Sequence, residues 1–293
     1  MKHLIRGMLY VIAAIPFPII YVLSDFFSFM VFRLFGYRKQ VVLDNLRNSF
    51  PEKSEEEIHK IRRKFYKNFT DVFLEMVKML NMSGKTIEKR VKILNPEVVK
   101  KYHEKGQSVL FVGGHCANWE WLAMSIAHYI DCDTYSVYKP LKNEAYGGLL
   151  EEMRGKTGNH LVPMKSFLRT ILKNKDRGVV NFMLADQTPH VGEIEYFSNF
   201  LHQETPVFLG VEKITKAVKM PLFFMDIHRV KRGHYEIEFV ELFNNYDNTK
   251  PYEVTEKHLK ALEELIKAEP SDWLWSHRRW KYTRKHVEKH NKK

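Results

Sequence analysis

The chain has 293 residues, of which 44% are hydrophobic and 13% aromatic, and this composition excludes an intrinsically disordered protein. Its 47 Lys and Arg against 35 Asp and Glu give a formal net charge of +12, which favours an anionic partner: nucleic acid, an anionic membrane surface, or an acidic or phosphorylated substrate. The two cysteines, Cys116 and Cys132, are too few for a disulfide framework and fit a reducing compartment.

Residues 1–36 predict a hydrophobic membrane anchor. Residues 8–24 (MLYVIAAIPFPIIYVLS) carry no charge, and a second apolar stretch follows after Asp25. A run of this length could cross a bilayer core, which takes about 20 apolar residues. Pro16 and Pro18 weaken a straight helix, so a kinked or tilted spanning helix and a half-buried helix pair are both open. A cleaved signal peptide is disfavoured because no small-x-small cleavage site follows.

The rest of the chain, residues 37–293, is predicted to form one domain that ends in a basic tail. Ser54 and Glu57 have the spacing of a helix capping box. An apolar stripe at helical intervals comes next, at Ile58, Ile61, Phe65, Phe69, Val72, Met76 and Leu80. We therefore expect a long amphipathic helix whose stripe packs on the core or on lipid.

From about Ile87 the pattern changes to short apolar segments separated by helical stretches. Buried strands are predicted at 108–114, 134–138 and 179–186, and helices at 119–130 and 143–156. Later segments predict an antiparallel hairpin around Gly233, from 221–230 and 234–242, and an amphipathic helix at 254–267. This order predicts an α/β fold with a mixed, mostly parallel sheet flanked by helices, and a site at the carboxyl ends of the strands.

The stretch GGHCANWE, residues 113–120, contains a candidate acid–base pair. Five residues apart on one helix, His115 and Glu120 would lie on different faces. They can meet only if His115 lies in the loop after the strand and Glu120 in the first helical turn, with Asn118 as the N-cap. The two glycines before His115 permit a sharp exit from the strand. Glu120 would then accept a hydrogen bond from one imidazole nitrogen and leave the other free to take a proton.

Two other readings of this stretch are weaker. Cys116 adjoins His115, but neighbouring side chains point apart, so we interpret Cys116 as a small apolar filler. No metal site is predicted, because the sequence has no H-E-x-x-H motif and no second His or Cys at a ligand interval. From these residues alone, a catalytic base and an ordinary polar pair both stay open.

The same stretch resembles the H-x4-[D/E] motif of the glycerolipid acyltransferase superfamily. Its G-H-x-x-N-W-E form is similar to the branch that contains the late acyltransferases of lipid A biosynthesis. Further blocks resemble this branch in the family's order: LDNLRNSFPEKSEEE, VYKPLKN with Arg154 downstream, LADQTP, ETP at 204–206, and WLWSHRRWK at 273–281. The resemblance covers nearly the whole chain.

The resemblance implies an enzyme that transfers a fatty acyl chain from acyl carrier protein to a hydroxyl of a lipid A precursor. His115 would be the general base and Glu120 the residue that orients it, with no metal or organic cofactor. It also implies an inner-membrane protein whose catalytic domain faces the cytoplasm. Acylation of a glycolipid, aminolipid or lysophospholipid is the alternative. A non-catalytic basic protein that binds membranes or nucleic acid is a further one, and the apolar N-terminus favours membrane over nucleic acid.

Basic residues downstream of the motif are candidate acceptor-binding groups. Lys139, Lys142 and Arg154 can bind phosphate or carboxylate, although a solvated basic face would look the same. Asp186 and Gln187 follow a buried strand and should emerge beside His115. Asp186 would pair with Arg154 or with an acceptor group, or cap the next turn.

The C-terminal third contains two more candidates. Thr205 with Pro206 fits a helix N-cap, and a contact of Thr205 with the acyl carbonyl or a phosphate is the alternative. Trp273, Trp275 and Trp280 could form a membrane-facing belt, or pack in the core. The Lys-rich tail beyond them suits anionic headgroups or the acidic carrier protein.

Overall fold

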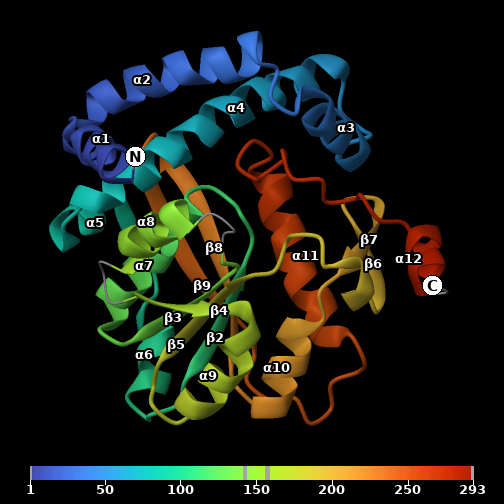
Figure 1. Ribbon diagram of the computed structural model, residues 1–293. Coiled ribbons are helices and arrows are strands. Elements are labelled where there is room, and N and C mark those ends of the chain that lie inside the picture. The colour runs from blue at the N-terminus through green and yellow to red at the C-terminus, as the bar shows by residue number, and fades with distance from the viewer. Residues whose placement is uncertain (1, 141–143, 156–158, 292–293) are drawn as a thin grey trace.

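The computed structural model describes residues 2–140, 144–155 and 159–291, and its centre is a seven-stranded mixed sheet (Figure 1). The strand order is β1-β9-β8-β2-β5-β3-β4, and only the β8–β9 pair is antiparallel. The strands are β1 (Val91–Ile93), β2 (Val109–Gly113), β3 (Thr134–Tyr138), β4 (Asn159–Pro163), β5 (Val180–Leu184), β8 (Leu222–Lys231) and β9 (His234–Phe243). The predicted fold class is confirmed.

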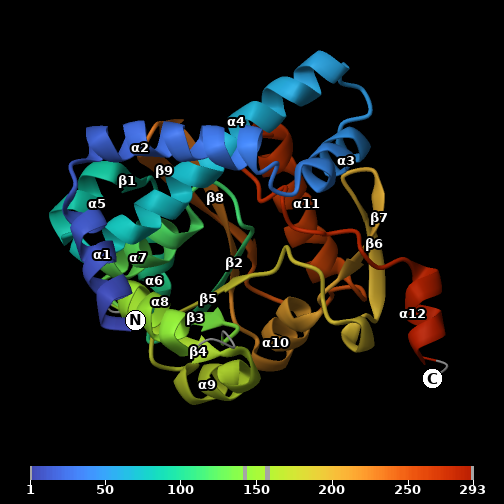
Figure 2. The same cartoon turned by 45° about the horizontal axis from the view of Figure 1, so that its top comes forward.

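Helices cover both faces of this sheet, as Figures 1 and 2 show. On one side lie α6 (Glu97–His103), α7 (Trp119–Ile130), α8 (Glu144–Gly155) and α9 (Phe167–Asn174). On the other lie α10 (Gly210–Val218) and α11 (Glu253–Ala268). The remaining short helices are α5 (Gly84–Arg90), η2 (Met79–Asn81), η3 (Met164–Ser166), η4 (Val191–Glu193) and α12 (Arg284–Asn291).

The middle of the sheet is apolar on both faces because helices cover both. All five residues of β2 are buried. The Phe111 ring of β2 lies 5.6 Å from the Phe223 ring and 4.6 Å from the Phe239 ring, measured between centroids. Full burial of one such side chain contributes about 1.5–3 kcal/mol. The core therefore holds the carboxyl ends of β2 and β5 in fixed positions.

Several predicted elements are confirmed closely. The helix at 119–130 and the strand at 134–138 have the predicted bounds. Strands β8 and β9 form the predicted hairpin, and Gly233 in its turn has a φ of +70°, a conformation that glycine adopts at little cost.

The N-terminal segment is a helix pair laid over a long helix (Figure 1). Pro16 separates α1 (Lys2–Ala14) from α2 (Phe17–Phe29), which continues into a π-helical turn, η1 (Met30–Leu34). After α3 (Lys39–Ser49), the predicted amphipathic helix is α4 (Glu55–Lys78), and it runs beneath α2. Its capping box is present, with the Glu57 amide donating to Ser54 Oγ and the Ser54 amide donating to Glu57 Oε2.

The prediction that Thr205 caps a helix is wrong. Thr205 lies in β7 (Gln203–Val207), which pairs with β6 (Tyr196–Phe200) in a separate two-stranded sheet, and α10 begins only at Gly210. Strand pairing satisfies the backbone groups here, and Pro206 is tolerated because both strands of a two-stranded sheet are edges.

Of the two alternatives for the C-terminal tryptophans, core packing is confirmed for Trp273 and Trp275, and a membrane-facing belt is wrong for both. Trp273 and Trp275 are only 2% and 0% exposed, and their ring centroids lie 4.7 Å apart. The Trp275 indole N–H donates to the carbonyl of Pro270. Since an indole needs one polar partner and a large apolar contact, the core satisfies both demands.

Candidate active site

The loop between β2 and α7 carries His115 at the carboxyl end of the sheet. Asn118 caps α7, as predicted, by accepting a hydrogen bond from the Trp121 amide at 2.9 Å. The left-handed residue of the loop is Ala117, with a φ of +47°, and its amide donates to the carbonyl of Asp272 at 2.8 Å. The C-terminal segment therefore holds the loop in place.

Gly114 is needed for close packing rather than for a sharp turn. It has no left-handed φ, but a Cβ at this position would lie 2.5 Å from Leu262 Cδ1 of α11. The expected reason for this glycine, conformational freedom, is therefore corrected: α11 approaches too closely for a side chain.

His115 is held by Asp186, which follows β5. His115 Nδ1 lies 2.6 Å from Asp186 Oδ1, and the His115 amide donates to Asp186 Oδ2 at 2.9 Å. The indole of Trp273 donates to the same Oδ2 at 2.8 Å. Because the acceptor at Nδ1 is a carboxylate, the neutral ring carries its proton on Nδ1 and presents the lone pair of Nε2.

Asp186 remains an anion although it is only 3% exposed. Burial alone would raise the pKa of Asp186. The neighbouring His115 and the hydrogen bonds from His115 and Trp273 outweigh it and hold this pKa well below its ordinary value. A fixed negative charge beside an imidazole stabilises the imidazolium form.

The predicted hydrogen bond between His115 and Glu120 is wrong. Glu120 faces Arg154 of α8, which donates from Nε to Oε2 at 2.8 Å and from Nη2 to Oε1 at 2.5 Å. The Asp186–Arg154 pair, one of the alternatives for Asp186, does not form, because Arg154 pairs with Glu120 and Asp186 pairs with His115. Adjacent parallel strands bring Asp186 to His115. The bidentate guanidinium takes both oxygens of Glu120, which is 6% exposed.

A cavity of about 360 Å³ opens beside His115. Five predicted residues line it: His115, Glu120, Lys139, Arg154 and Gln187. Its other lining residues come from α7, α8, η3 and the strands β3, β4 and β5, and they include Ala123, Ser136, Tyr138, Leu161, Phe182 and Leu184. The cavity is therefore lined by charged and polar side chains together with apolar ones.

The other predicted residues lie elsewhere. Asp186 supports His115 and is not in the cavity lining. Asn118 is fully buried, and its amide nitrogen donates to Glu75 Oε2 at 2.7 Å, so it shapes the loop instead of meeting a substrate. Thr205 is also buried and accepts from the indole of Trp280. Lys142 lies outside the described residues.

Two contributors were missed from the sequence, Trp273 and Glu75. Trp273 lies in the block WLWSHRRWK, which marked it as a residue of interest. The sequence does not indicate that its indole would donate to the Asp186 carboxylate. Glu75 carried no signal, because one acidic residue in a long helix is usually solvated. Its buried position depends on the packing of α4 against β9 and α7.

Cys116 is buried, and burial raises the pKa of its thiol well above the ordinary value. It is therefore a protonated filler of the core. Across the part of the chain that the structure describes, no group of three or more His, Cys, Asp or Glu side chains is arranged to hold a metal ion.

Comparison with known proteins agrees with the blocks in the sequence. No curated protein sequence matches the chain significantly. The family model of the bacterial lipid A biosynthesis acyltransferases matches residues 1–282, nearly the whole chain. Because this match covers nearly the whole chain, and because His115 lines a cavity at the site, the chain belongs to the bacterial lipid A biosynthesis acyltransferase family.

Proposed function

We propose that this acyltransferase moves a fatty acyl chain from acyl carrier protein to a hydroxyl of a lipid A precursor, with His115 as the general base. The observation that carries the proposal is the bond from His115 Nδ1 to the buried Asp186, with the imidazole at the cavity wall. Family membership supports the reaction class.

In the proposed step, His115 Nε2 takes the proton of the acceptor hydroxyl while its oxygen attacks the thioester carbonyl carbon. The new C–O bond forms, and the C–S bond breaks as the tetrahedral intermediate collapses. The imidazolium, stabilised by Asp186, returns the proton to the leaving thiolate of the carrier's pantetheine arm. The proposed reaction uses no metal ion and no organic cofactor.

We assign Glu120 a positioning role through Arg154. The Glu120 carboxylate holds the guanidinium in the cavity wall, where Arg154 and Lys139 would bind the anionic groups of the acceptor lipid. The apolar wall, which includes Ala123, Leu161 and Phe182, suits the fatty acyl chain. Gln187, whose amide nitrogen lies 3.4 Å from His115 Nε2, would contact the reacting groups.

For location, we propose the inner membrane with the catalytic domain facing the cytoplasm, where acyl carrier protein is available. The apolar N-terminal helices support membrane association. Acyl carrier protein, an anionic lipid and the membrane would be the partners, and nucleic acid would not.

The decisive test is His115→Ala, assayed with an acyl carrier protein thioester and a lipid A precursor. Loss of a general base should reduce the transfer rate by about 10²–10⁴-fold. The matched control is His190→Ala, since His190 is exposed and lies outside the cavity lining. Near-normal transfer by a folded His115→Ala protein would overturn the mechanism. Lipid mass spectrometry with and without the protein would identify the acceptor, because one lipid class should lack an acyl chain.

A further inference from the structure

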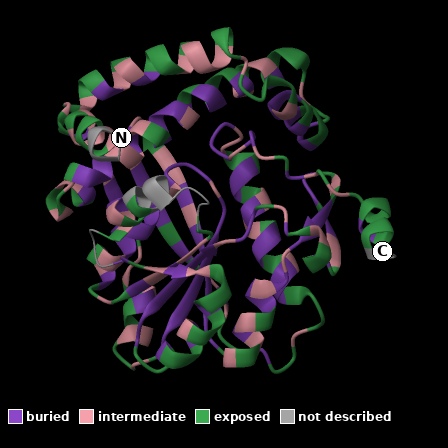
Figure 3. Cartoon of the chain, viewed as in Figure 1, coloured by how far each residue is buried: buried purple, intermediate pink, exposed green. Residues whose placement is uncertain are grey.

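Helix α2 and the π-helical turn after it present an apolar stripe that the protein does not cover. Ile19, Val22, Phe26 and Phe29 follow one another at intervals of three or four residues and are 53%, 68%, 58% and 56% exposed. Only 11% of the residues in 17–34 are buried, so α2 is not a core helix. Exposed apolar residues also occur in neighbouring segments, at Met8, Val11, Leu34 and Phe35. Figure 3 shows exposed residues along the outer helix pair.

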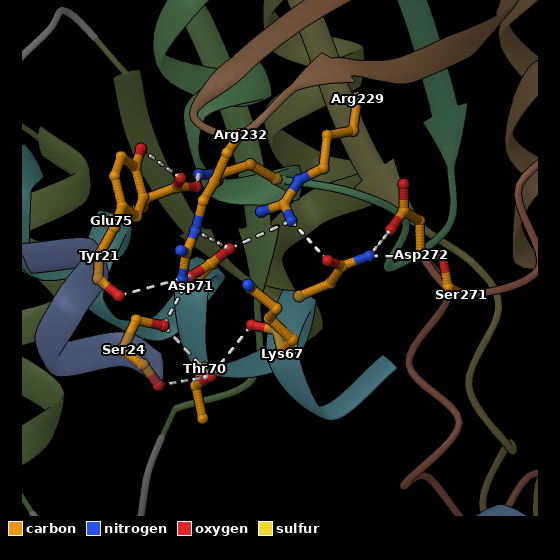
Figure 4. A network of polar contacts seen from close by, with 12 residues as sticks. Tyr21, Ser24, Lys67, Thr70, Asp71, Glu75, Arg229, Arg232, Ser271 and Asp272 are labelled. Atoms are coloured by element: carbon orange, nitrogen blue, oxygen red, sulfur yellow. Dashed lines mark hydrogen bonds and ion pairs between the residues drawn. The ribbon is translucent and has the colours of Figure 1, made fainter. Parts of the chain in front are cut away.

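The opposite face of α2 is bonded to buried carboxylates of α4 (Figure 4). The Tyr21 hydroxyl donates to Glu75 Oε1 at 2.8 Å, and the Ser24 hydroxyl donates to Asp71 Oδ1 at 2.5 Å. Glu75 and Asp71 are both 0% exposed. Lifting α2 away would therefore remove partners from two buried acids.

Arginines of the β8–β9 hairpin complete this network. Arg232 Nη2 donates to Asp71 Oδ1 at 2.6 Å, to Asp25 Oδ1 at 2.8 Å and to the carbonyl of Tyr21 at 3.1 Å. Arg229 Nη1 donates to Asp71 Oδ2 at 3.2 Å. The network joins α2, α4 and the hairpin, and it pairs the buried Asp71 carboxylate with both arginines (Figure 4).

Contacts at both ends show that α2 and η1 follow α4 along their length. At one end, the Lys78 ammonium donates to the carbonyl of Ile15 at 2.6 Å. At the other, the Tyr66 hydroxyl donates to the carbonyl of Tyr37 at 2.5 Å. The direction of α2 in a membrane is therefore the direction of α4. A spanning α2 would draw the exposed ion pair between Asp25 of α2 and Lys67 of α4 into hydrocarbon, where charged groups are costly.

We propose that the protein enters the membrane from one side only. Helices α1 and α2 lie in the plane of the interface with the apolar stripe among the acyl chains. The N-terminus then stays on the same side of the bilayer as the catalytic domain. Arg33, Arg38 and Lys39, all exposed where the stripe ends, lie at the level of anionic headgroups. This inference is independent of the acyl donor and the reaction.

The first experiment identifies what covers the stripe. In the full chain, the double variant Val22→Asp with Phe26→Asp should move most of the protein from the membrane pellet to the soluble fraction. Leu168→Asp with Leu172→Asp is the matched control, because these exposed apolar residues lie on α9, at the other end of the molecule (Figure 1). It should stay in the pellet. A stripe covered by a second copy of the chain would instead give a change from dimer to monomer with unaltered membrane binding, which would overturn the proposal.

The second experiment measures topology. In a Cys132→Ser background, Gly7→Cys in α1 and Lys105→Cys in the catalytic domain are tested with a membrane-impermeant maleimide. In intact spheroplasts neither should react, and after lysis both should react. Reaction of Gly7→Cys alone in intact spheroplasts would show that the segment spans, and the proposal would fail.

Spin labels at Val11, Val22 and Phe29 measure depth in vesicles that contain anionic lipid. All three should lie at one shallow depth, below the headgroups. A depth that increases steadily from Val11 towards the bilayer centre, or passes through it, would contradict a flat arrangement.

Discussion

At the residue scale, the two carboxylates near His115 have different partners, and this predicts different kinetic roles. Asp186 bonds to the imidazole, whereas Glu120 bonds to the guanidinium of Arg154. Both side chains are largely buried. A group that stabilises the imidazolium acts on the transition state. A group that positions a substrate-binding cation affects the binding of the acceptor in the ground state as well as in the transition state, and so affects its KM.

We therefore expect Asp186→Asn to reduce kcat by about 10³–10⁴-fold with little change in KM, because an amide at this position favours the wrong imidazole tautomer. Glu120→Gln should chiefly raise the KM for the lipid acceptor. Steady-state kinetics with both substrates varied will separate the two effects. The same change in kcat and KM for both variants would contradict the assignment, and circular dichroism confirms that each variant is folded.

At the element scale, the loop after β2 depends on the close approach of α11. A Cβ at Gly114 would lie 2.5 Å from Leu262 Cδ1, and it is this side chain that would have to move. Helix α11 also contains His258, which is 2% exposed and whose Nε2 has no partner in the described residues.

Gly114→Ala should destabilise the protein by about 1–3 kcal/mol through overpacking. Leu262→Ala removes the clash, so in that background the same substitution should cost less than about 0.5 kcal/mol, beyond the loss from Leu262→Ala itself. Unfolding of the four proteins of this double-mutant cycle gives the coupling. Equal costs in both backgrounds would mean that Gly114 is needed for another reason.

His258 should make stability depend on pH. Burial lowers its pKa from 6.5 to about 4, against the smaller opposing effect of Glu212. Between these values the unfolded chain binds more protons, so stability is lost as the pH falls. The loss is about 2 kcal/mol between pH 7 and pH 5. His258→Leu should flatten the dependence of Tm on pH in this window. Part of the pH dependence should persist in this variant, because burial lowers the pKa of His277 to about 4 as well. An unaltered pH profile would show that His258 does not titrate on unfolding.

At the scale of the whole molecule, the positive charge is unevenly placed. Helix α12 lies beside β6 and β7, on the other side of the molecule from α1 (Figures 1 and 2). Lys285 and Lys289 on α12 are exposed. An acidic carrier protein would be attracted to such a surface, and salt would screen the attraction beyond about 10 Å.

Raising NaCl from about 50 to 300 mM should therefore increase the KM for an acyl carrier protein donor about five-fold. The same acyl group on pantetheine alone, without the protein, should show little change. Lys285→Glu with Lys289→Glu should raise the KM for the protein donor at low salt only. If both donors respond equally to salt, the carrier is not recognised through this charge.

The sequence by itself determined the fold class, the bounds of α7 and β3, the β8–β9 hairpin, the α4 capping box and the Asn118 cap, because these depend on local periodicity and on local hydrogen bonds. The tertiary structure alone decided that Asp186, 71 residues away, and not Glu120 meets His115. It also decided that Trp273 and Trp275 pack in the core and not at the membrane, and it bonded α2 to the acids of α4. Each of these depends on which strands and helices become neighbours, and spacing along the chain cannot specify a contact between distant segments.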